Sequence, residues 1–394
     1  MTNQVTKIIF FIEAPFGERN YSRYGIEILQ KNGFDVEVWD FIPFLHPDVH
    51  QKVAVPDPIN FAGYRKFLRK QDALAAIAGL SPSCFVMCLV RYQSESYAVY
   101  RALSDQGIRY GVARTNAVPV ASAVRDPRSV LDLIKQSSPA RLFSVLFSRI
   151  PFRYMGVRPA SVVLAGGAQS MRTPSKYPLN HETEILWAHT RDYDVYLNEK
   201  ERPVQLDTNL GVFLDEYLPF HPDYVQTGMP PPSGPDSYFP ALRRLFDVLE
   251  RELRVKIVIA AHPLACYEEY SDYFGGRPIV QGKSLELIRE ARFAIAHEST
   301  VLNFAVLFNK PVLFVTTDEI ERNPREARFI HAMAGWLNKA AINADATLDR
   351  DWDKDLTVDE NAYARYREAY IKKSGSPEKP TWQILADHLK ASKA

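Results

Sequence analysis

The sequence predicts an α/β protein made of two Rossmann-like domains, each with a parallel β-sheet. Its 394 residues are enough for two domains of ordinary size. Short apolar runs alternate with stretches of helical periodicity along both halves of the chain. Strands that alternate with helices pair in parallel through right-handed crossovers. We therefore expect an N-terminal domain over 1–200, a C-terminal domain over 205–345 that faces it across a cleft, and helices over 346–394 that pack back on the domains.

The composition is that of a globular protein with little net charge. Hydrophobic residues make up 46%, enough for a core in each domain, and 48 basic residues nearly balance 47 acidic ones. A net charge of +1 gives no global positive field, so we expect no nucleic-acid partner. The 3 cysteines form no CxxC pair, which indicates a reduced, cytoplasmic protein. No signal peptide is visible, and no apolar run approaches the roughly 20 residues that span a bilayer.

The first half opens with a pattern typical of a β-α-β unit. A buried strand (KIIFFI) is followed by a loop, a helix that ends at Gly33 and a second strand (DVEVWDF). The loop from Glu13 to Asn20 contains no GxGxxG, so a dinucleotide fingerprint is absent. The periodicity then predicts helices near 59–79 and 94–106, and strands at 83–90, RYGVART, ASVVLAGG and TEILWAHTRDYDVYL.

Residues 125–158 are amphipathic, basic and aromatic. Their cations are Arg125, Arg128, Lys135, Arg141, Arg149, Arg153 and Arg158. Such a stretch could lie on the anionic inner face of a membrane or meet a lipid-linked acceptor. We favour the simpler interpretation, a helix that packs on the core and leaves its basic face in water.

The second half alternates strands and helices regularly. Strands are predicted at 211–218, 256–263, 277–283, 293–298 and 310–317, with helices at 237–254, 266–274, 284–291 and 299–309, and one or two amphipathic helices from about 358. In an open parallel sheet, ligands bind beyond the carboxyl ends of the strands. Four polar pairs stand there: Asp215–Glu216, His262–Pro263, Gly282–Lys283 and His297–Glu298. We expect all four to face one crevice.

The fourth pair leads into a candidate phosphate site. Ser299 or Thr300 can cap the helix that follows, and a helix N-terminus offers unpaired N–H groups and a partial positive charge to an anion. An ordinary N-cap is the alternative. Because this helix start falls in the predicted crevice, we favour phosphate binding, to which Lys283 could add positive charge.

His262 and the acidic pair are candidates for the chemistry. A histidine at a strand end can donate a proton to a leaving phosphate or neutralise it, or it can simply bond within its loop; Pro263 makes that turn rigid. A carboxylate of Asp215 or Glu216 can act as general base on an acceptor hydroxyl, and an exposed acidic turn is the alternative. Adjacent strand residues point to opposite faces, so we expect only one of these two in the crevice.

The segment HTRDYD, residues 189–194, contains a D-x-D triplet. Such triplets bind a divalent metal in the other common sugar-transferase architecture, but they are frequent by chance. Asp192 and Asp194 precede the expected domain boundary, so we interpret them as acceptor-binding or interdomain residues and assign no metal. No CxxC set or HExxH motif supports zinc.

The order of these motifs resembles that of a known family. An acidic pair, an HP motif and a paired-hydroxyl motif are the signatures of bacterial sialyltransferase-like enzymes, which have the GT-B glycosyltransferase architecture. They correspond here to Asp215–Glu216, His262–Pro263 and Ser299–Thr300. The resemblance implies that the acidic pair supplies the base, the histidine meets the leaving nucleotide phosphate and the hydroxyl pair binds phosphate. It also implies a CMP-activated sugar and no metal or other cofactor.

A second resemblance covers the same half of the chain. The stretch HESTVLNFAVLFNKPVLFV resembles capsule-polysaccharide and CDP-glycerol polymer transferases, and the motif spacing extends over about 130 residues. Tyr217 stands where the sialyltransferase-like pattern has glycine. That departure concerns the CMP-sialic acid subfamily more than the GT-B architecture.

These observations predict a cytoplasmic glycosyltransferase of bacterial surface polysaccharide synthesis. It would move a sugar from a nucleotide-activated donor, CMP-linked or else UDP- or GDP-linked, to a glycan or a lipid-linked glycan. A nucleotide-sugar epimerase or hydrolase of the same fold is one alternative, and Glu13, Asp192 or His189 could then supply a second acid or base. A non-catalytic polysaccharide-assembly protein is the other.

Overall fold

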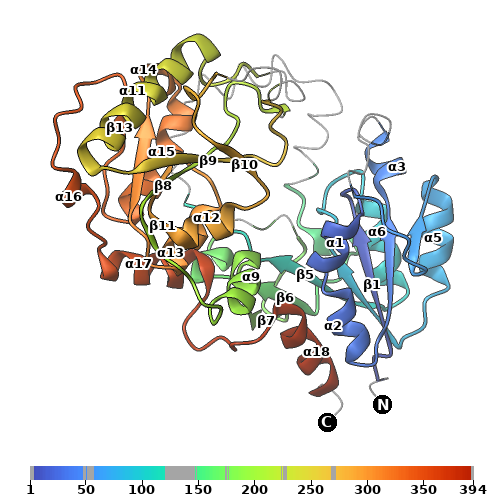
Figure 1. Ribbon diagram of the computed structural model, residues 1–394. Coiled ribbons are helices and arrows are strands. Elements are labelled where there is room, and N and C mark those ends of the chain that lie inside the picture. The colour runs from blue at the N-terminus through green and yellow to red at the C-terminus, as the bar shows by residue number, and fades with distance from the viewer. Residues whose placement is uncertain are drawn as a thin grey trace. The chain divides into compact units, whose positions relative to one another are not determined.

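The computed structural model describes residues 4–47, 50, 57–119, 147, 149–173, 175, 177–222, 224, 229–267 and 272–391, which form two compact units (Figure 1). The first unit takes residues up to 117, 147–194 and 372–391, and the second takes 118–119 and 195–371. The sequence places the division near 200–205, whereas in the structure it falls between Asp194 and Val195. The chain returns to the first unit at Lys372.

The first unit is built on a seven-stranded sheet in the order β3-β2-β1-β4-β5-β6-β7. Its strands are β1 (Lys7–Ile12), β2 (Asp35–Asp40), β3 (Tyr64–Lys66), β4 (Cys84–Cys88), β5 (Arg109–Arg114), β6 (Val162–Ala165) and β7 (Glu184–Trp187). All of these pairings are parallel, which confirms the prediction from the alternation of strands and helices. The strand order reverses between β1 and β4.

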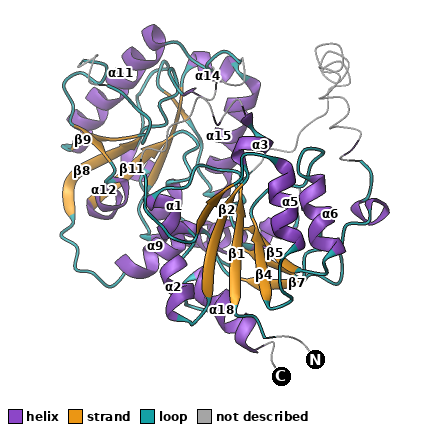
Figure 2. Cartoon of the chain, turned by 90° about the vertical axis from the view of Figure 1, so that its right-hand side faces the viewer, coloured by secondary structure: helices purple, strands orange, loops and turns teal. Residues whose placement is uncertain are grey.

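Side chains of β1 alternate between two cores, as the period of a strand requires. Ile9 and Phe11 pack with residues of α5 (Lys70–Ala78) and α6 (Tyr97–Asp105). Ile8 and Phe10 pack with residues of α2 (Ile26–Lys31) and α18 (Thr381–Ala391). Figure 2 shows the two pairs of helices on opposite sides of the sheet.

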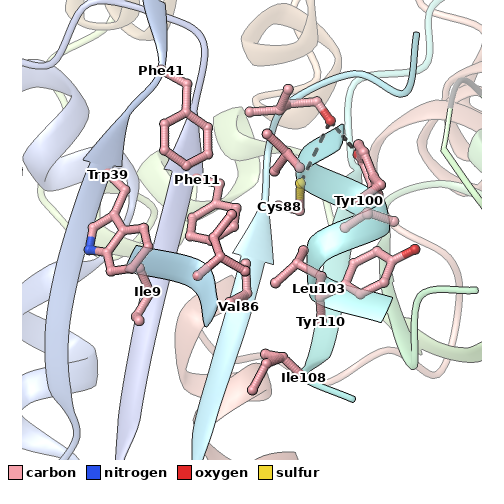
Figure 3. Packing of buried hydrophobic residues seen from close by; sticks show 14 of the residues in the cluster. Ile9, Phe11, Trp39, Phe41, Val86, Cys88, Tyr100, Leu103, Ile108 and Tyr110 are labelled. Carbon is pink, nitrogen blue, oxygen red and sulfur yellow. Dashed lines mark hydrogen bonds between the residues drawn. The ribbon is translucent and has the colours of Figure 1, made fainter. Parts of the chain in front are cut away.

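Two polar side chains lie bonded within the first of these cores (Figure 3). The thiol of Cys88 and the hydroxyl of Tyr100 both donate to the carbonyl oxygen of Val90. Burial raises the pKa of the Cys88 thiol to about 12, so it stays protonated and inert at neutral pH. Cys84, on the same strand, is also a free thiol.

Three elements of the first unit differ from the prediction. The expected helix near 59–79 starts only at Lys70, because Tyr64–Lys66 pair with β2 as the edge strand β3. The helix expected before Gly33 is two helices, α1 (Glu18–Arg23) and α2, because Gly25 between them has a left-handed φ of 53°. The predicted strand TEILWAHTRDYDVYL ends at Trp187, and Arg191–Glu199 form helix α9, so the D-x-D triplet lies on a helix.

The basic stretch 125–158 lies mostly outside the described residues, which include only 147 and 149–158 of it. Phe147 is buried, and Phe152–Met155 form a single 3-10 turn, η1. Both interpretations of the stretch stay predictions. Within the described part of the chain, no helix combines the length and the apolar character needed to cross a membrane.

The second unit is built on a six-stranded sheet in the order β10-β9-β8-β11-β12-β13, again with parallel pairing throughout. Its strands are β8 (Asp207–Leu214), β9 (Lys256–Ala261), β10 (Ile279–Gln281), β11 (Ala291–Ala296), β12 (Val312–Thr316) and β13 (Ile342–Asn343). Helices α11 (Pro235–Leu253), α12 (Ser284–Glu290) and α13 (Leu302–Leu307) follow the prediction, whereas α14 (Asp318–Arg322), α15 (Pro324–Trp336) and β13 were not predicted. The described residues of the expected helix 266–274 are not helical.

The C-terminal segment is shared between the units. Helices α16 (Trp352–Asp355) and α17 (Glu360–Tyr366) and the π-helical turn Arg367–Ile371 belong to the second unit. Helix α18 belongs to the first, where Leu385 and Leu389 enter the core with Trp382. The segment therefore contributes apolar side chains to the hydrophobic core of each unit, because it is too small to form a core by itself.

Candidate functional site

The candidate site lies beyond the carboxyl ends of β8 and β11, in the middle of the second sheet. These strands are neighbours although β9 and β10 come between them in the sequence, so the strand order reverses here. Ligands of open parallel sheets bind at such a reversal. β8 ends at Leu214 and β11 ends at Ala296, so Asp215–Glu216 and His297–Glu298 are the first residues beyond these two ends.

Asp215 is a buried carboxylate that organises the turn around it. Its Oδ1 accepts a hydrogen bond from the backbone N–H of Tyr217 at 3.0 Å, and its Oδ2 accepts one from the hydroxyl of Tyr267 at 2.9 Å. Oδ2 also accepts from the backbone N–H of His262 at 3.4 Å. Burial raises the pKa of Asp215 to about 6, while these hydrogen bonds act in the opposite direction. With both oxygens occupied, Asp215 fixes the turns that follow β8 and β9.

Tyr217 has the backbone geometry of a glycine. Its φ is 56°, in the left-handed region that a side chain disfavours, and glycine is the residue that the sialyltransferase-like pattern has here. The ring of Tyr217 lies 5.2 Å from that of Tyr267 and 5.4 Å from that of Phe220. We attribute the tolerance of this strained conformation to these ring contacts and to the hydrogen bond from its N–H to Asp215.

Glu216 points toward the end of the neighbouring strand. Its Oε1 accepts a hydrogen bond from the backbone N–H of Glu298 at 2.8 Å, and the N–H of Ser299 also acts on this carboxyl. Burial raises the pKa of Glu216 to about 8 in spite of these donors, and the charge of Asp215 adds to the increase. Backbone amides that the sequence assigned to a phosphate therefore meet a carboxyl group of the protein.

Two more carboxyl groups complete an acidic cluster with Glu216. Burial, the charge of Glu216 and a carboxyl–carboxyl contact with Glu326 raise the pKa of Glu298 to about 9. Glu326 is buried in the first turn of α15, where the hydroxyl of Tyr224 lies 3.4 Å from its Oε1. With pKa values of about 8 and about 9, Glu216 and Glu298 both retain protons at neutral pH.

His297 is fully buried, and its hydrogen-bond partners lie outside this cluster. Its Nδ1 lies 2.6 Å from the carbonyl oxygen of Val315, and its Nε2 lies 2.9 Å from the hydroxyl of Tyr238. A carbonyl can only accept, so Nδ1 carries the proton and Nε2 accepts from Tyr238. Burial lowers the pKa of His297 to about 4, so it is neutral. Its predicted role in ligand binding stays a prediction, whereas the structure shows it as a buried, hydrogen-bonded residue of the core.

His262 lies in the turn after β9, as predicted. Its Nδ1 accepts from the backbone N–H of Leu264 at 3.2 Å, and its ring lies 4.9 Å from that of His221. Gln281, which ends β10, donates from Nε2 to the carbonyl oxygens of His262 and Pro263, both at 3.0 Å. Gln281 therefore ties the His262–Pro263 turn to the edge of the sheet, a role that no sequence motif indicated.

Two parts of the predicted site have a different geometry. The side chains of Ser299 and Thr300 do not cap a helix: α13 starts at Leu302 after the N-cap Val301, and the carbonyls of Ser299 and Thr300 accept from Leu302 and Asn303. The predicted cap is therefore wrong, because the chain makes a tight turn before the helix begins. The proposed phosphate contact of the two hydroxyls stays a prediction.

Gly282 and Lys283 follow β10, the edge strand of the sheet, and both are exposed. Gly282 has a φ of 76°, which turns the chain into α12, and Lys283 immediately precedes that helix. They lie at the edge of the sheet, and Gln281 beside them reaches the His262 turn. Among the described residues, no group of three or more His, Cys, Asp or Glu side chains is placed to hold a metal.

The D-x-D segment belongs to the first unit. Asp194 accepts a hydrogen bond from the backbone N–H of Thr381 at 2.8 Å, and its carboxylate lies 3.8 Å from Nε2 of the buried His189.

Glu13, just after β1, is held by two partners of the first unit. It lies 3.2 Å from Nε2 of His46 and accepts from Arg91 at 2.8 Å. Burial alone would raise the pKa of Glu13, but these two partners outweigh it and lower the pKa.

Comparison with known proteins identifies a fold class but no family. No protein-family model matches the sequence, and no curated protein matches it. A variant of the wall teichoic acid polymerase TagF soaked with CDPG has a similar structure, with a TM-score of 0.54, 14% identity, and coverage of 99% of this chain and 90% of that one. MnaA from S. aureus with UDP gives a TM-score of 0.50, 13% identity and coverage of 98% and 97%. A UDP-N-acetylglucosamine 2-epimerase gives a TM-score of 0.46, 14% identity, and coverage of 99% of this chain and 96% of that one.

These likenesses, together with the two parallel sheets, define the fold class. The chain has the GT-B type of fold, with one Rossmann-like parallel sheet in each of two units. This confirms the predicted fold. The cleft expected between the halves stays a prediction, as do the roles of individual site residues.

Proposed function

We propose that this protein is a glycosyltransferase that takes a sugar from a nucleotide-activated donor bound at the carboxyl edge of the second sheet. The observation that carries the proposal is the cluster of Glu216, Glu298 and Glu326 at the point where the strand order reverses. Carboxyl groups with raised pKa values at a ligand-binding edge are typical of acid–base sites. Two structures with TM-scores of at least 0.50, one with CDPG and one with UDP, make donors linked to a nucleoside diphosphate the first to test.

Glu216 is the carboxyl group that we assign as general base. A general base accepts a proton only when it is ionised and works best when its pKa is close to the operating pH. Burial raises the pKa of Glu216 to about 8, so its ionised fraction grows as the pH approaches 8. Asp215 has both oxygens engaged by Tyr217, Tyr267 and His262, so we assign it to positioning. His262, in the turn that Asp215 holds, is then the group that meets the leaving phosphate, with Ser299, Thr300 and Lys283 as further phosphate contacts.

The acceptor in this proposal is a glycan or a lipid-linked glycan of a bacterial surface polysaccharide. It rests on the sequence resemblance to capsule-polysaccharide and polymer transferases and on the likeness to TagF. We further propose that the chemistry requires no metal. Transfer that continues undiminished in excess EDTA would support this, and transfer restored only by added Mg²⁺ or Mn²⁺ would contradict it.

The first experiment is nucleotide binding followed by thermal unfolding. A ligand that binds only the folded protein raises the melting temperature, and at 100 times its Kd the stabilisation is about 2.7 kcal/mol. We expect CDP, UDP, GDP or CMP at millimolar concentration to raise the melting temperature, and His262→Ala to reduce the shift. No shift from any of the four would contradict the donor site.

One observation favours a second candidate, a nucleotide-sugar epimerase. Epimerisation requires both an acid and a base beside one carbon. Glu216 and Glu298 are neighbouring carboxyl groups with pKa values raised to about 8 and about 9, so near pH 8 Glu216 can lose its proton while Glu298 keeps its own. Incubation of the donor in D₂O without an acceptor separates the two. Deuterium at an inverted sugar carbon would identify an epimerase, whereas an intact donor that is consumed only with an acceptor would identify a transferase.

A further inference from the structure

A cavity lies in the first unit, at the carboxyl edge of the seven-stranded sheet. Its volume is about 280 Å³. Residues after three strands line it: Ala14 after β1, Leu89 after β4, and Thr115 and Asn116 after β5. β1 and β4 are the neighbours between which the strand order reverses, so the cavity occupies the position where a parallel sheet binds a ligand. Helices α1, α9 and α18 supply the remaining walls.

Arg23 of α1 lines this cavity, and one of its hydrogen-bond donors lacks an acceptor. Its Nη1 donates to Oδ1 of Asn20 at 3.3 Å, and Asn20 is itself fixed by donating to the carbonyl of Pro15. Its Nε is buried and has no hydrogen-bond partner within the described part of the chain. Buried donors are paired in the great majority of cases, so a donor such as this one calls for an acceptor that the protein does not provide.

The charged side chains that line the cavity favour the binding of an anion. Arg23 and Arg191 contribute two guanidinium groups, and Asp194 is the carboxylate among the described lining residues. Asp194 is engaged, since it accepts from Thr381 N–H at 2.8 Å and lies 3.8 Å from Nε2 of His189. Asp57 and Asp192 also act on the charge of Arg23, but neither of them lines the cavity.

His189 lies beside Asp194 and has hydrogen-bond partners on both ring nitrogens. Its Nδ1 lies 2.9 Å from the carbonyl oxygen of Thr190, and its Nε2 lies 2.8 Å from that of Lys379. Burial raises the pKa of Asp194, while the hydrogen bond from the N–H of Thr381 acts in the opposite direction. The two arginines therefore outnumber the one carboxyl group among the described lining residues.

We propose that this cavity binds an oxyanion, a phosphate or a carboxylate, with Arg23 and Arg191 as its ligands. A guanidinium group matches the geometry of both anions. The rings of Tyr24 and Trp382 also line the cavity and suit the apolar face of a sugar ring. The ligand is therefore a sugar that carries an anionic group. That this sugar is the acceptor rests on the proposed function, whereas the anion site itself does not.

The test is isothermal titration calorimetry of the full chain with glucose 6-phosphate, glucuronate and glucose. These share a ring and differ in charge, so they also separate a phosphate site from a carboxylate site. We expect one or both anions to bind and glucose to bind at least tenfold more weakly. Arg23→Gln and Arg191→Gln should each weaken binding of the anion about tenfold or more, since a hydrogen bond to a charged group is lost. Arg19→Gln, an exposed charge on the same helix, should change it less than about twofold.

The outcomes separate this site from the donor site. Absence of binding by both anions, or equal binding by wild type and the two arginine variants, would overturn the anion site even if CDP or UDP still binds. Anion binding that needs both arginines while no nucleotide binds would uphold the site and contradict the proposed function. Two variants on different helices guard against a loss that only reflects unfolding of one of them, and circular dichroism of each variant checks its fold.

Discussion

Glu216 accepts a hydrogen bond from the backbone N–H of Glu298 at 2.8 Å, and this bond joins the ends of the two central strands of the second sheet. It brings together two acidic residues that would repel each other if both were ionised. The pKa of Glu216 is raised to about 8 and that of Glu298 to about 9, so the pair retains protons at neutral pH. The same amides would be available to a ligand phosphate if the Glu216 side chain moved aside. Competition between a carboxyl group and a substrate for these amides is a feature that mutation can test.

Glu216→Gln should abolish most of the transferase activity and leave the donor bound. Gln keeps the size of the side chain but cannot accept the proton of an acceptor hydroxyl, and general-base catalysis is typically worth about 10²–10⁴-fold in rate. We expect kcat to fall by that factor while the Kd for the nucleotide changes less than about threefold. Steady-state kinetics and calorimetry measure the two quantities. Glu286→Gln, an exposed glutamate on α12, is the control and should keep full activity; a Glu216→Gln variant with wild-type kcat would refute the assignment.

The raised pKa of Glu216 also predicts how stability depends on pH. Its ordinary pKa is 4.5 and its folded pKa is about 8, so between these values the folded state holds a proton that the unfolded state has lost. Stability is therefore lost as the pH rises through this window, and Glu298 extends the window to about 9. We expect the urea midpoint of the wild type to fall more between pH 6 and 9 than that of Glu216→Gln. Parallel curves for the two proteins would show that Glu216 titrates normally.

Tyr238→Phe should destabilise the second unit through His297. The hydroxyl of Tyr238 is the donor for Nε2 of His297, and the loss of one partner leaves a buried acceptor unsatisfied. Such a loss costs about 1–3 kcal/mol. Denaturant unfolding at pH 7 measures it, and Tyr154→Phe, an exposed tyrosine of the first unit, should cost less than about 0.5 kcal/mol. A neutral effect of Tyr238→Phe would mean that water replaces the hydroxyl.

The left-handed backbone of Tyr217 gives an unusual order of stabilities. Tyr217→Ala keeps a Cβ at a φ of 56° and loses the ring contacts with Tyr267 and Phe220, whereas Tyr217→Gly loses both the ring and the strain. We expect the glycine variant to be more stable than the alanine variant by about 1 kcal/mol, the reverse of their order in a helix or strand. Unfolding curves of both variants decide this. An alanine variant that is the more stable one would show that the turn relaxes out of this conformation.

Much of the fold could be predicted because strand and helix periods are local properties of the chain. FAIAHE reads as a buried strand with polar residues after it, and β11 does end at Ala296 with His297 and Glu298 beyond. The same reasoning failed at Gly25, where a Cβ would lie 2.3 Å from the Trp382 ring. That contact joins the second helix of the chain to the last one, and no local pattern carries it.

The sequence by itself determined that two parallel sheets form and that acidic, histidine and hydroxyl pairs stand at the strand ends of the second. Only the tertiary structure decided what each of these residues meets. His297 and Glu298 are neighbours in the chain, yet one is a neutral core histidine bonded to Tyr238 and the other joins an acidic cluster with Glu326. Glu326 carried no signal of its own beyond an ordinary acidic first turn of a helix. The physical reason is that a side chain's pKa and hydrogen bonds depend on burial and on partners brought from distant parts of the chain, and these exist only once the chain has folded.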